Sequence, residues 1–241
     1  MQYSYEKGMF NGGILVSQDG KVIYKNALGY ADKENDRKLN EASVFYLASV
    51  SKQFTTMAIM ILKEQKKLSY DDKLSKYFPE FPAYANTVTI KHLMTHTSGI
   101  ADPYGLIYEK GGNNDKKRIT NRDVKELLLE HNQLDFQPGD KYSYSNGGYI
   151  FLALIVEKVS GLPFHKFMET NIFKPLGMNN TFVHNESAPK IENRAVAHTQ
   201  ASELNDFVRI FDDFEFFTRG DGGIFSTLDD LHLWDLSLIH I

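Results

Sequence analysis

The sequence predicts an α+β fold, with strands at the start of the chain and helices through its middle. Within residues 12–30, two aliphatic runs flank Asp19-Gly20, a pair that suits the positive φ angles of a tight hairpin turn. Apolar residues then recur at helical spacing over about 49–65. We expect one domain over residues 1–241, with a helix-rich subdomain at approximately 66–180.

Shorter helices are expected to follow. Residues 89–94 resemble a short helix, whereas 104–118 is rich in Gly, Asn and Lys and is expected to be a mobile surface loop. Asn121 is a candidate N-cap for a helix that continues to about His131. An apolar helix should then end at Gly161.

The last third of the chain is less regular. Pro163 suits the first turn of another helix, which should stop before Pro175. The aromatic and acidic stretch 206–217 fits a strand or a loop, and Thr227 begins a capping sequence for a last helix through Leu238.

Composition excludes several classes of protein. The net charge is −4, the sequence pI is about 6.1 and basic residues are scattered, so we expect no nucleic-acid binding. The absence of cysteine excludes disulfides, thiolate metal sites and cysteine nucleophiles. The longest apolar run, 149–156, is too short to span a bilayer, and no signal pattern follows Met1. The compartment stays open, because an export segment could lie outside this sequence.

The first set of candidate catalytic residues is Ser49-Val-Ser-Lys52. Residues three apart at the start of a helix share a face, so the Lys52 amine should lie near the Ser49 hydroxyl. A desolvated lysine activates a serine nucleophile by taking its proton, and a helix N-terminus favours developing negative charge. On spacing alone, an N-cap serine beside a surface lysine is the favoured explanation of the pair.

The second set is Tyr144-Ser-Asn146. A phenol near the same serine would shuttle its proton to a leaving group, and a carboxamide would hold a substrate carbonyl or amide. Taken alone, the segment is better explained as a polar loop that caps the next helix. The two sets together, about 90 residues apart, give the S-x-x-K and Y-x-N arrangement of penicillin-recognising serine enzymes.

The rest of the sequence extends this likeness in the expected order. Matching segments lie at 45–54, 90–99, 142–161, 173–178 and 222–231, the second of them corresponding to "LLTHTSG". The chain therefore resembles the penicillin-binding-protein and class C β-lactamase superfamily of serine hydrolases, which includes D,D-carboxypeptidases and esterases. The resemblance implies a β-lactamase/transpeptidase-like fold, an antiparallel sheet flanked by helices with a helical subdomain.

The same resemblance implies a mechanism. Ser49 would form an acyl-enzyme, and its backbone N–H would give one oxyanion-hole donor. Lys52 and Tyr144 would share the base and acid work, Asn146 would orient the substrate, and no cofactor or metal is implied. The substrates would be small molecules or peptidoglycan-like peptides, and relatives work mostly in the bacterial cell envelope.

The family's third motif, K-T-G or H-x-G on a strand near the C-terminus, is absent from the sequence. We therefore expect a C-terminally truncated chain whose last strands are missing. Loss of one oxyanion donor typically costs about 10²–10³ in turnover, so weak activity or none is expected of this chain. A two-stranded hairpin is marginal alone, which suggests self-association through the incomplete sheet.

Three functions remain open. The first is a serine hydrolase acting on D-amino-acid peptides, β-lactams or small esters, with a carboxypeptidase or esterase favoured over an efficient β-lactamase. The second is a non-catalytic relative that binds a partner or assembles. The third is a metal hydrolase using His92 and His96, which lie four apart but lack the glutamate of H-E-x-x-H, so a structural role is favoured.

Overall fold

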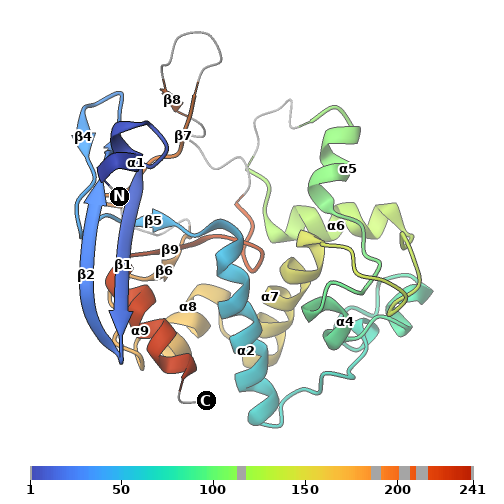
Figure 1. The fold of residues 1–241 in the computed structure, drawn as a ribbon. Coiled ribbons are helices and arrows are strands. Elements are labelled where there is room, and N and C mark those ends of the chain that lie inside the picture. The colour runs from blue at the N-terminus through green and yellow to red at the C-terminus, as the bar shows by residue number, and fades with distance from the viewer. Residues whose placement is uncertain (1, 113–117, 186–190, 201–206, 210–216, 240–241) are drawn as a thin grey trace. The chain divides into compact units, whose positions relative to one another are not determined.

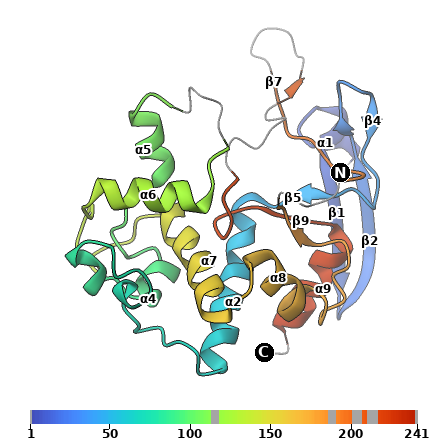
Figure 2. The ribbon, with the colours of Figure 1, turned by 180° about the vertical axis from the view of Figure 1, so that it is seen from behind.

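The computed structural model describes residues 2–112, 118–185, 191–200, 207–209 and 217–239 (Figures 1 and 2). The chain divides into two compact units. The sheet unit consists of residues 1–46, 173–214 and 225–241, and the helical unit consists of 47–172 and 215–224.

The described strands pair in an antiparallel manner in their two-stranded sheets and between β5 and β9. The strands are β1 Gly12–Gln18, β2 Lys21–Leu28, β3 Tyr30–Asp32, β4 Arg37–Lys38, β5 Phe45–Tyr46, β6 Phe182–Val183, β7 His198–Gln200, β8 Phe207–Arg209 and β9 Ile224–Ser226. The sheets contain β1-β2, β3-β4, β7-β8 and the three-stranded β5-β9-β6.

The predicted hairpin is present as β1 and β2, which pair from Gly12 opposite Leu28 to Gln18 opposite Lys21. Asp19 and Gly20 have φ angles of 51° and 75°. Two successive positive φ angles give a turn whose twist matches that of the strands, which is why this dipeptide suits the position.

Helices make up most of the helical unit and a smaller part of the sheet unit. They are α1 Gln2–Glu6, α2 Lys52–Glu64, α3 Leu74–Tyr77, α4 Ile90–Met94, α5 Pro103–Glu109, α6 Asn121–His131, α7 Asn146–Ser160, α8 Phe164–Met168 and α9 Leu228–Leu238. The described residues also contain the 3₁₀ turns η1 Ala48–Ser51 and η2 Ala83–Asn86 and the π-helical turn η3 Glu169–Phe173.

Helix α7 forms the centre of the helical unit. It packs against α2, α4, α6 and α8, and both views show it beside α2 (Figures 1 and 2). Because neighbours surround it, most of its residues are apolar and buried, as expected of a core helix. Phe151 on α7 lies with its ring 5.4 Å from that of Phe78 and 5.2 Å from that of Phe81. The helix ends at Gly161 in a left-handed conformation, as the sequence predicts.

Two local predictions are wrong. The stretch expected to be a loop contains α5, because the Asp102 side chain accepts the Tyr104 N–H and Pro103 occupies the first helical position; residues 113–117 of that stretch lie outside the described residues. Helix α6 is capped by Thr120 rather than Asn121. Thr120 and Asp123 form a reciprocal capping box, a pattern that the aspartate could have revealed.

Most of the stretch 206–217, expected to be a strand or a loop, lies outside the described residues. Its described part contains β8. The last helix, α9, runs from Leu228 to Leu238 with Thr227 as its N-cap, as predicted.

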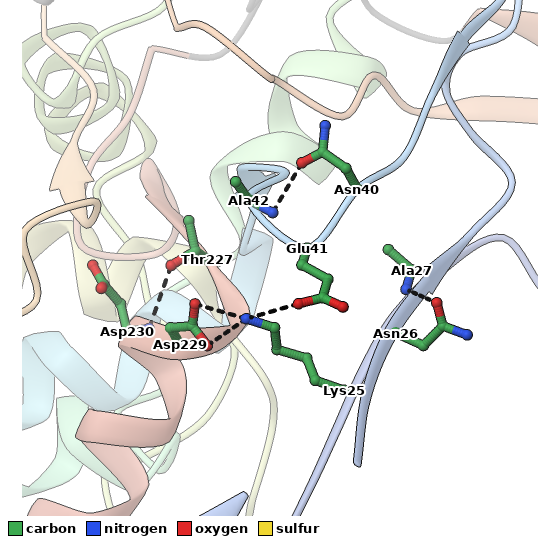
Figure 3. A network of polar contacts seen from close by, with 9 residues as sticks. All are labelled: Lys25, Asn26, Ala27, Asn40, Glu41, Ala42, Thr227, Asp229 and Asp230. Carbon is green, nitrogen blue, oxygen red and sulfur yellow. Dashed lines mark hydrogen bonds and ion pairs between the residues drawn. The ribbon is translucent and has the colours of Figure 1, made fainter.

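A polar network in the sheet unit joins β2 to the first turn of α9 (Figure 3). Lys25 donates to both carboxylate oxygens of Asp229 at 2.9 and 3.0 Å and lies 3.3 Å from Glu41. The hydrogen bond to Asp229 raises the pKa of Lys25 against the opposing effect of desolvation. An acidic side chain also stabilises a helix N-terminus, so Asp229 both stabilises the start of α9 and binds Lys25 of β2.

Among the described residues, no single helix is long and apolar enough to cross a membrane. One pair, Asn146–Ser160 with Phe164–Phe173, passes that test of length and composition only when its two helices are taken together, and they are bent by 77°.

Replacing Phe151 with alanine should lower the free energy of unfolding by about 3–5 kcal/mol, because a large side chain that is 1% exposed leaves a cavity between two other rings. Urea denaturation of Phe151→Ala would measure this. Met60→Ala, on the exposed side of α2, is the matched control and should change stability by less than about 1 kcal/mol. Equal losses in the two variants would contradict this account of the core.

Candidate active site

The sharp entry into α2 brings Ser49 and Lys52 together. The turn η1 precedes the helix directly, and Lys52 Nζ lies 3.1 Å from Ser49 Oγ. Ala48, immediately before the serine, has a φ angle of 45°, a left-handed conformation that non-glycine residues rarely adopt. Strain of this kind is often held at functional sites, and here it adjoins an exposed serine hydroxyl.

The Lys52 amine is enclosed by oxygen atoms. Besides Ser49 Oγ, it donates to Asn146 Oδ1 at 2.9 Å and to the backbone carbonyl of Asp221 at 2.8 Å. The residue is only 7% exposed, so these three contacts replace most of the water that an amine normally binds. Lys52 is therefore a buried amine with a fixed direction, and the surface lysine of the alternative interpretation is excluded.

Tyr144 approaches the serine from another side. Its hydroxyl donates to Ser49 Oγ at 2.7 Å, and the Lys52 amine lies 4.8 Å from the centre of its ring. The His96 ring stacks on the Tyr144 ring at 4.5 Å, which fixes the plane of the phenol. Tyr144 is 43% exposed, so its hydroxyl stays open to an incoming molecule.

Asn146, the first residue of α7, is oriented by Asp102. One oxygen of Asp102, Oδ2, accepts both the Asn146 backbone N–H at 2.9 Å and its side-chain Nδ2 at 2.8 Å. Since a carboxylate only accepts, the amide nitrogen must face Asp102 and the amide oxygen must face Lys52.

The segment 218–224 passes over α2 and α7 and supplies the third acceptor for Lys52. Thr55 on α2 donates to the carbonyl of Gly220 at 2.8 Å, and Asn121 exchanges two hydrogen bonds with the backbone of Arg219. Gly220 has a φ angle of 99°, and a Cβ atom there would lie 2.4 Å from the carbonyl oxygen of Tyr149. Glycine is therefore required for this close approach to α7.

Asp221 has an unusual side-chain environment. Tyr104 donates to its Oδ2, and Thr218 Oγ1 lies 3.3 Å from the same oxygen. Its other oxygen, Oδ1, is buried without a hydrogen-bond partner in the described part of the chain. Burial raises the pKa of the Asp221 carboxyl, against the opposing effects of Tyr104 and Lys52. The neutral acid is therefore favoured more than for an ordinary aspartate.

The two histidines four apart have separate structural contacts. His92 takes part in the capping box of α4, whereas His96 lies beyond the end of that helix with a φ angle of 55°. His96 Nδ1 accepts the Ser145 N–H at 3.2 Å. No group of three or more potential metal ligands occurs in the described residues.

The structure thus brings all four sequence-predicted site residues together around one serine hydroxyl. Sequence reasoning missed Asp102, Tyr104 and Asp221, which hold Asn146 and the 218–224 segment in place. The glycine-rich sequence Gly220-Asp-Gly-Gly223 was the available signal, since clustered glycines mark close backbone approach. The oxyanion role expected of the Ser49 N–H stays a prediction.

Comparison with known proteins places this geometry in a family. A family model described as "Beta-lactamase" matches residues 2–239. Penicillin-binding protein 4* of Bacillus subtilis is 36% identical over 248 residues, which cover 97% of this chain and 53% of that protein. The chain thus spans about half the length of this curated relative.

Solved structures give the same result for the fold. A penicillin-binding protein from Bacillus halodurans superposes with a TM-score of 0.86 at 27% identity, covering 99% of this chain and 72% of that one. The octameric penicillin-binding protein homologue from Pyrococcus abyssi gives 0.84 at 29% identity, covering 99% and 54%. The predicted β-lactamase/transpeptidase-like fold and the family resemblance are therefore confirmed.

Acidification should destabilise the protein in part through His96. Burial and the nearby Lys52 charge lower the pKa of His96 below its ordinary value. The unfolded state then takes up a proton at a higher pH than the folded state, so stability is lost as the pH falls through and below about 6.5. Unfolding of the parent and His96→Asn chains, measured between pH 7.5 and 5, should show a steeper fall for the parent.

Burial also lowers the pKa values of His92 and His165. The contribution of His96 is therefore measured by the difference between the stability curves of the parent and His96→Asn chains. Parallel curves would show that His96 does not contribute.

Proposed function

Because the chain belongs to the beta-lactamase family of serine hydrolases, we propose that Ser49 attacks a substrate carbonyl and forms an acyl-enzyme. One observation carries the proposal: an exposed serine hydroxyl is hydrogen-bonded by both a buried amine and a phenol, at 3.1 and 2.7 Å. A serine hydroxyl is a weak nucleophile until an adjacent base takes its proton, and these two groups are within reach of that proton.

The surroundings of Lys52 support its role as the base. A neutral amine has two hydrogens and one lone pair, and the Asn146 and Asp221 carbonyl oxygens are able only to accept. If the two hydrogens point to these oxygens, the lone pair points to Ser49 Oγ. The neutral amine is then directed to take the serine proton as the serine oxygen attacks.

Tyr144 is proposed to complete the proton transfer. Once Ser49 Oγ is bonded to the carbonyl carbon, the Tyr144 hydroxyl gives its proton to the leaving nitrogen or oxygen and the bond to that atom breaks. The Lys52 ammonium, which holds the former serine proton, then returns a proton to the phenolate. Water releases the acyl group by the same steps in reverse, so protons balance over the cycle.

Asn146 and the Ser49 N–H are proposed to bind the substrate. With one Nδ2 hydrogen committed to Asp102 and one oxygen lone pair to Lys52, the Asn146 carboxamide retains one donor and one acceptor. That pair matches a peptide or amide group of a substrate. The Ser49 backbone N–H would donate to the oxyanion that forms on attack.

The proposed substrates are D-amino-acid peptides, β-lactams and small esters. The penicillin-binding names of the relatives support a pocket that accepts β-lactams as acylating agents. We favour a carboxypeptidase-type or esterase-type hydrolase over an efficient β-lactamase. Self-association through the incomplete sheet is also proposed, supported by the octameric state of one similar protein.

Incubation of the purified chain with a penicillin and, separately, with an activated ester should add the mass of one acyl group. Ser49→Ala should show no adduct, because it lacks the nucleophile, and intact-mass spectrometry measures both. Labelling by one reagent only would narrow the substrate class. Absence of any adduct from the folded parent chain, even after an incubation long enough to reveal the weak activity expected without the third motif, would contradict the proposal and favour a non-catalytic binding protein.

Tyr144→Phe should slow acylation by about 10²–10⁴-fold, the usual contribution of a positioned acid–base group. The phenyl ring keeps the stacking partner of His96, so the fold should be retained. Tyr142→Phe is the matched control, since Tyr142 is exposed beside the same histidine and acts on no reacting atom in this scheme. Stopped-flow measurement of the acylation rate gives the comparison, and equal rates in the two variants would remove Tyr144 from the mechanism.

A further inference from the structure

We infer that the first turn of α5 positions the Lys52 amine from two sides, with Asp102 acting through Asn146 and Tyr104 acting through Asp221. The inference rests on the proposed function, because it concerns how the base is aimed at Ser49. Asp102 and Tyr104 are positioning residues, since neither contacts the serine or the amine.

The first route begins at Asp102. Its Oδ1 accepts the Tyr104 N–H at 3.0 Å and thereby caps α5, while Oδ2 accepts both nitrogens of Asn146. The carboxylate is therefore bonded on both sides and has a single orientation. It turns the Asn146 oxygen toward the Lys52 amine, 2.9 Å away.

The second route begins two residues later. The Tyr104 hydroxyl donates to the Asp221 carboxyl and lies 2.7 Å from Thr218 Oγ1, so it joins both ends of the turn 218–221. The backbone carbonyl of Asp221 faces Lys52 at 2.8 Å. Because the side chain of Asp221 is bonded to Tyr104 and its carbonyl to Lys52, the position of α5 fixes the position of that carbonyl.

The two routes have a joint consequence. The two carbonyl oxygens that direct the Lys52 hydrogens are both held by residues of one helical turn, Asp102-Pro-Tyr104. Pro103 is buried at the first helical position, which stiffens this turn. A shift of α5 would move both acceptors together and turn the amine lone pair away from Ser49.

The direct alternative is an ion pair between Lys52 and the Asp221 carboxylate. The geometry disfavours it, because the amine contacts the Asp221 backbone carbonyl while the carboxyl is bonded to Tyr104 and Thr218. Burial also raises the pKa of this carboxyl. The neutral variant Asp221→Asn should therefore acylate much faster than Asp221→Ala, whereas an ion pair would make the two equally slow.

The main test uses two substitutions of Asp102. Asp102→Ser keeps a helix cap for α5 but cannot reach Asn146. Asp102→Asn keeps the shape but replaces one of the two accepting oxygens by an NH₂ group, which then meets either the Tyr104 N–H or the two Asn146 nitrogens. Both should reduce the maximal acylation rate by about 10²-fold, as expected for a base misplaced by about 1 Å, with little change in apparent reagent affinity.

The split between rate and affinity separates positioning from a loss of structure. A misdirected amine lowers the maximal acylation rate, whereas a collapsed pocket also weakens the apparent affinity for the reagent. Tyr104→Phe loses only the hydroxyl that bonds to Asp221 and Thr218, so it should lower the maximal rate without weakening the apparent affinity.

Thr227→Ala is the matched control, because it removes a helix-capping acceptor from α9 in the sheet unit. It should leave the acylation rate and the environment of Lys52 unchanged. A change in Thr227→Ala equal to that in Asp102→Ser would show that the effect does not depend on the contact between Asp102 and Asn146, which would overturn the inference.

A second readout does not require activity. The ¹³Cε signal of Lys52, assigned by its loss in Lys52→Arg, should shift in Asp102→Ser, Asp102→Asn and Tyr104→Phe. If the parent chain forms no adduct but these shifts occur, the proposed function fails while the positioning contacts stand. An unchanged Lys52 signal in all three folded variants would overturn the inference whatever the activity.

Discussion

The buried amine of Lys52 is the constraint on which the rest of the site depends. An amine taken out of water is tolerated only where oxygen acceptors replace its hydration, and each acceptor must be held at the right distance. The serine comes from η1, the carboxamide from the start of α7 and the carbonyl from the segment after β8. These three parts of the helical unit are thus fixed relative to α2, which carries Lys52, by a single nitrogen atom.

Contacts between neighbours in sequence were predictable. Ser49 and Lys52 are three residues apart, so helical geometry alone brings them together, and the Asp19-Gly20 turn follows from two residues that accept positive φ angles. Family resemblance added Tyr144 and Asn146, which spacing alone could not join to the serine. The order of the motifs along the chain therefore predicted which distant residues meet, whereas local periodicity predicted only contacts between residues close in sequence.

The residues that hold the site together were not predictable in this way. Asp102 lies 44 residues from Asn146, and Tyr104 lies 117 residues from Asp221, so no local pattern links them. The composition of 104–118 suggested a loop, yet the Asp102-Pro103 pair starts a helix there. The Gly and Asn content of a segment gives only its average tendency to form a loop. One capping side chain followed directly by a proline determines the backbone conformation at that position.

The distances along the chain also bear on how the protein folds. The contact between Lys52 and the Asp221 carbonyl closes a loop of 169 residues, whereas the Ser49 contact spans three. The entropy lost in closing a long loop must be overcome before a distant contact stabilises the structure. Local turns and helix α2 therefore form ahead of the docking of 218–224. During synthesis, the serine and lysine therefore exist as an ordinary solvated pair until residues 218–224 have been made and docked. The buried environment of the Lys52 amine is therefore assembled by the most distant of its contacts, and the serine–lysine pair that is local in sequence does not create it alone.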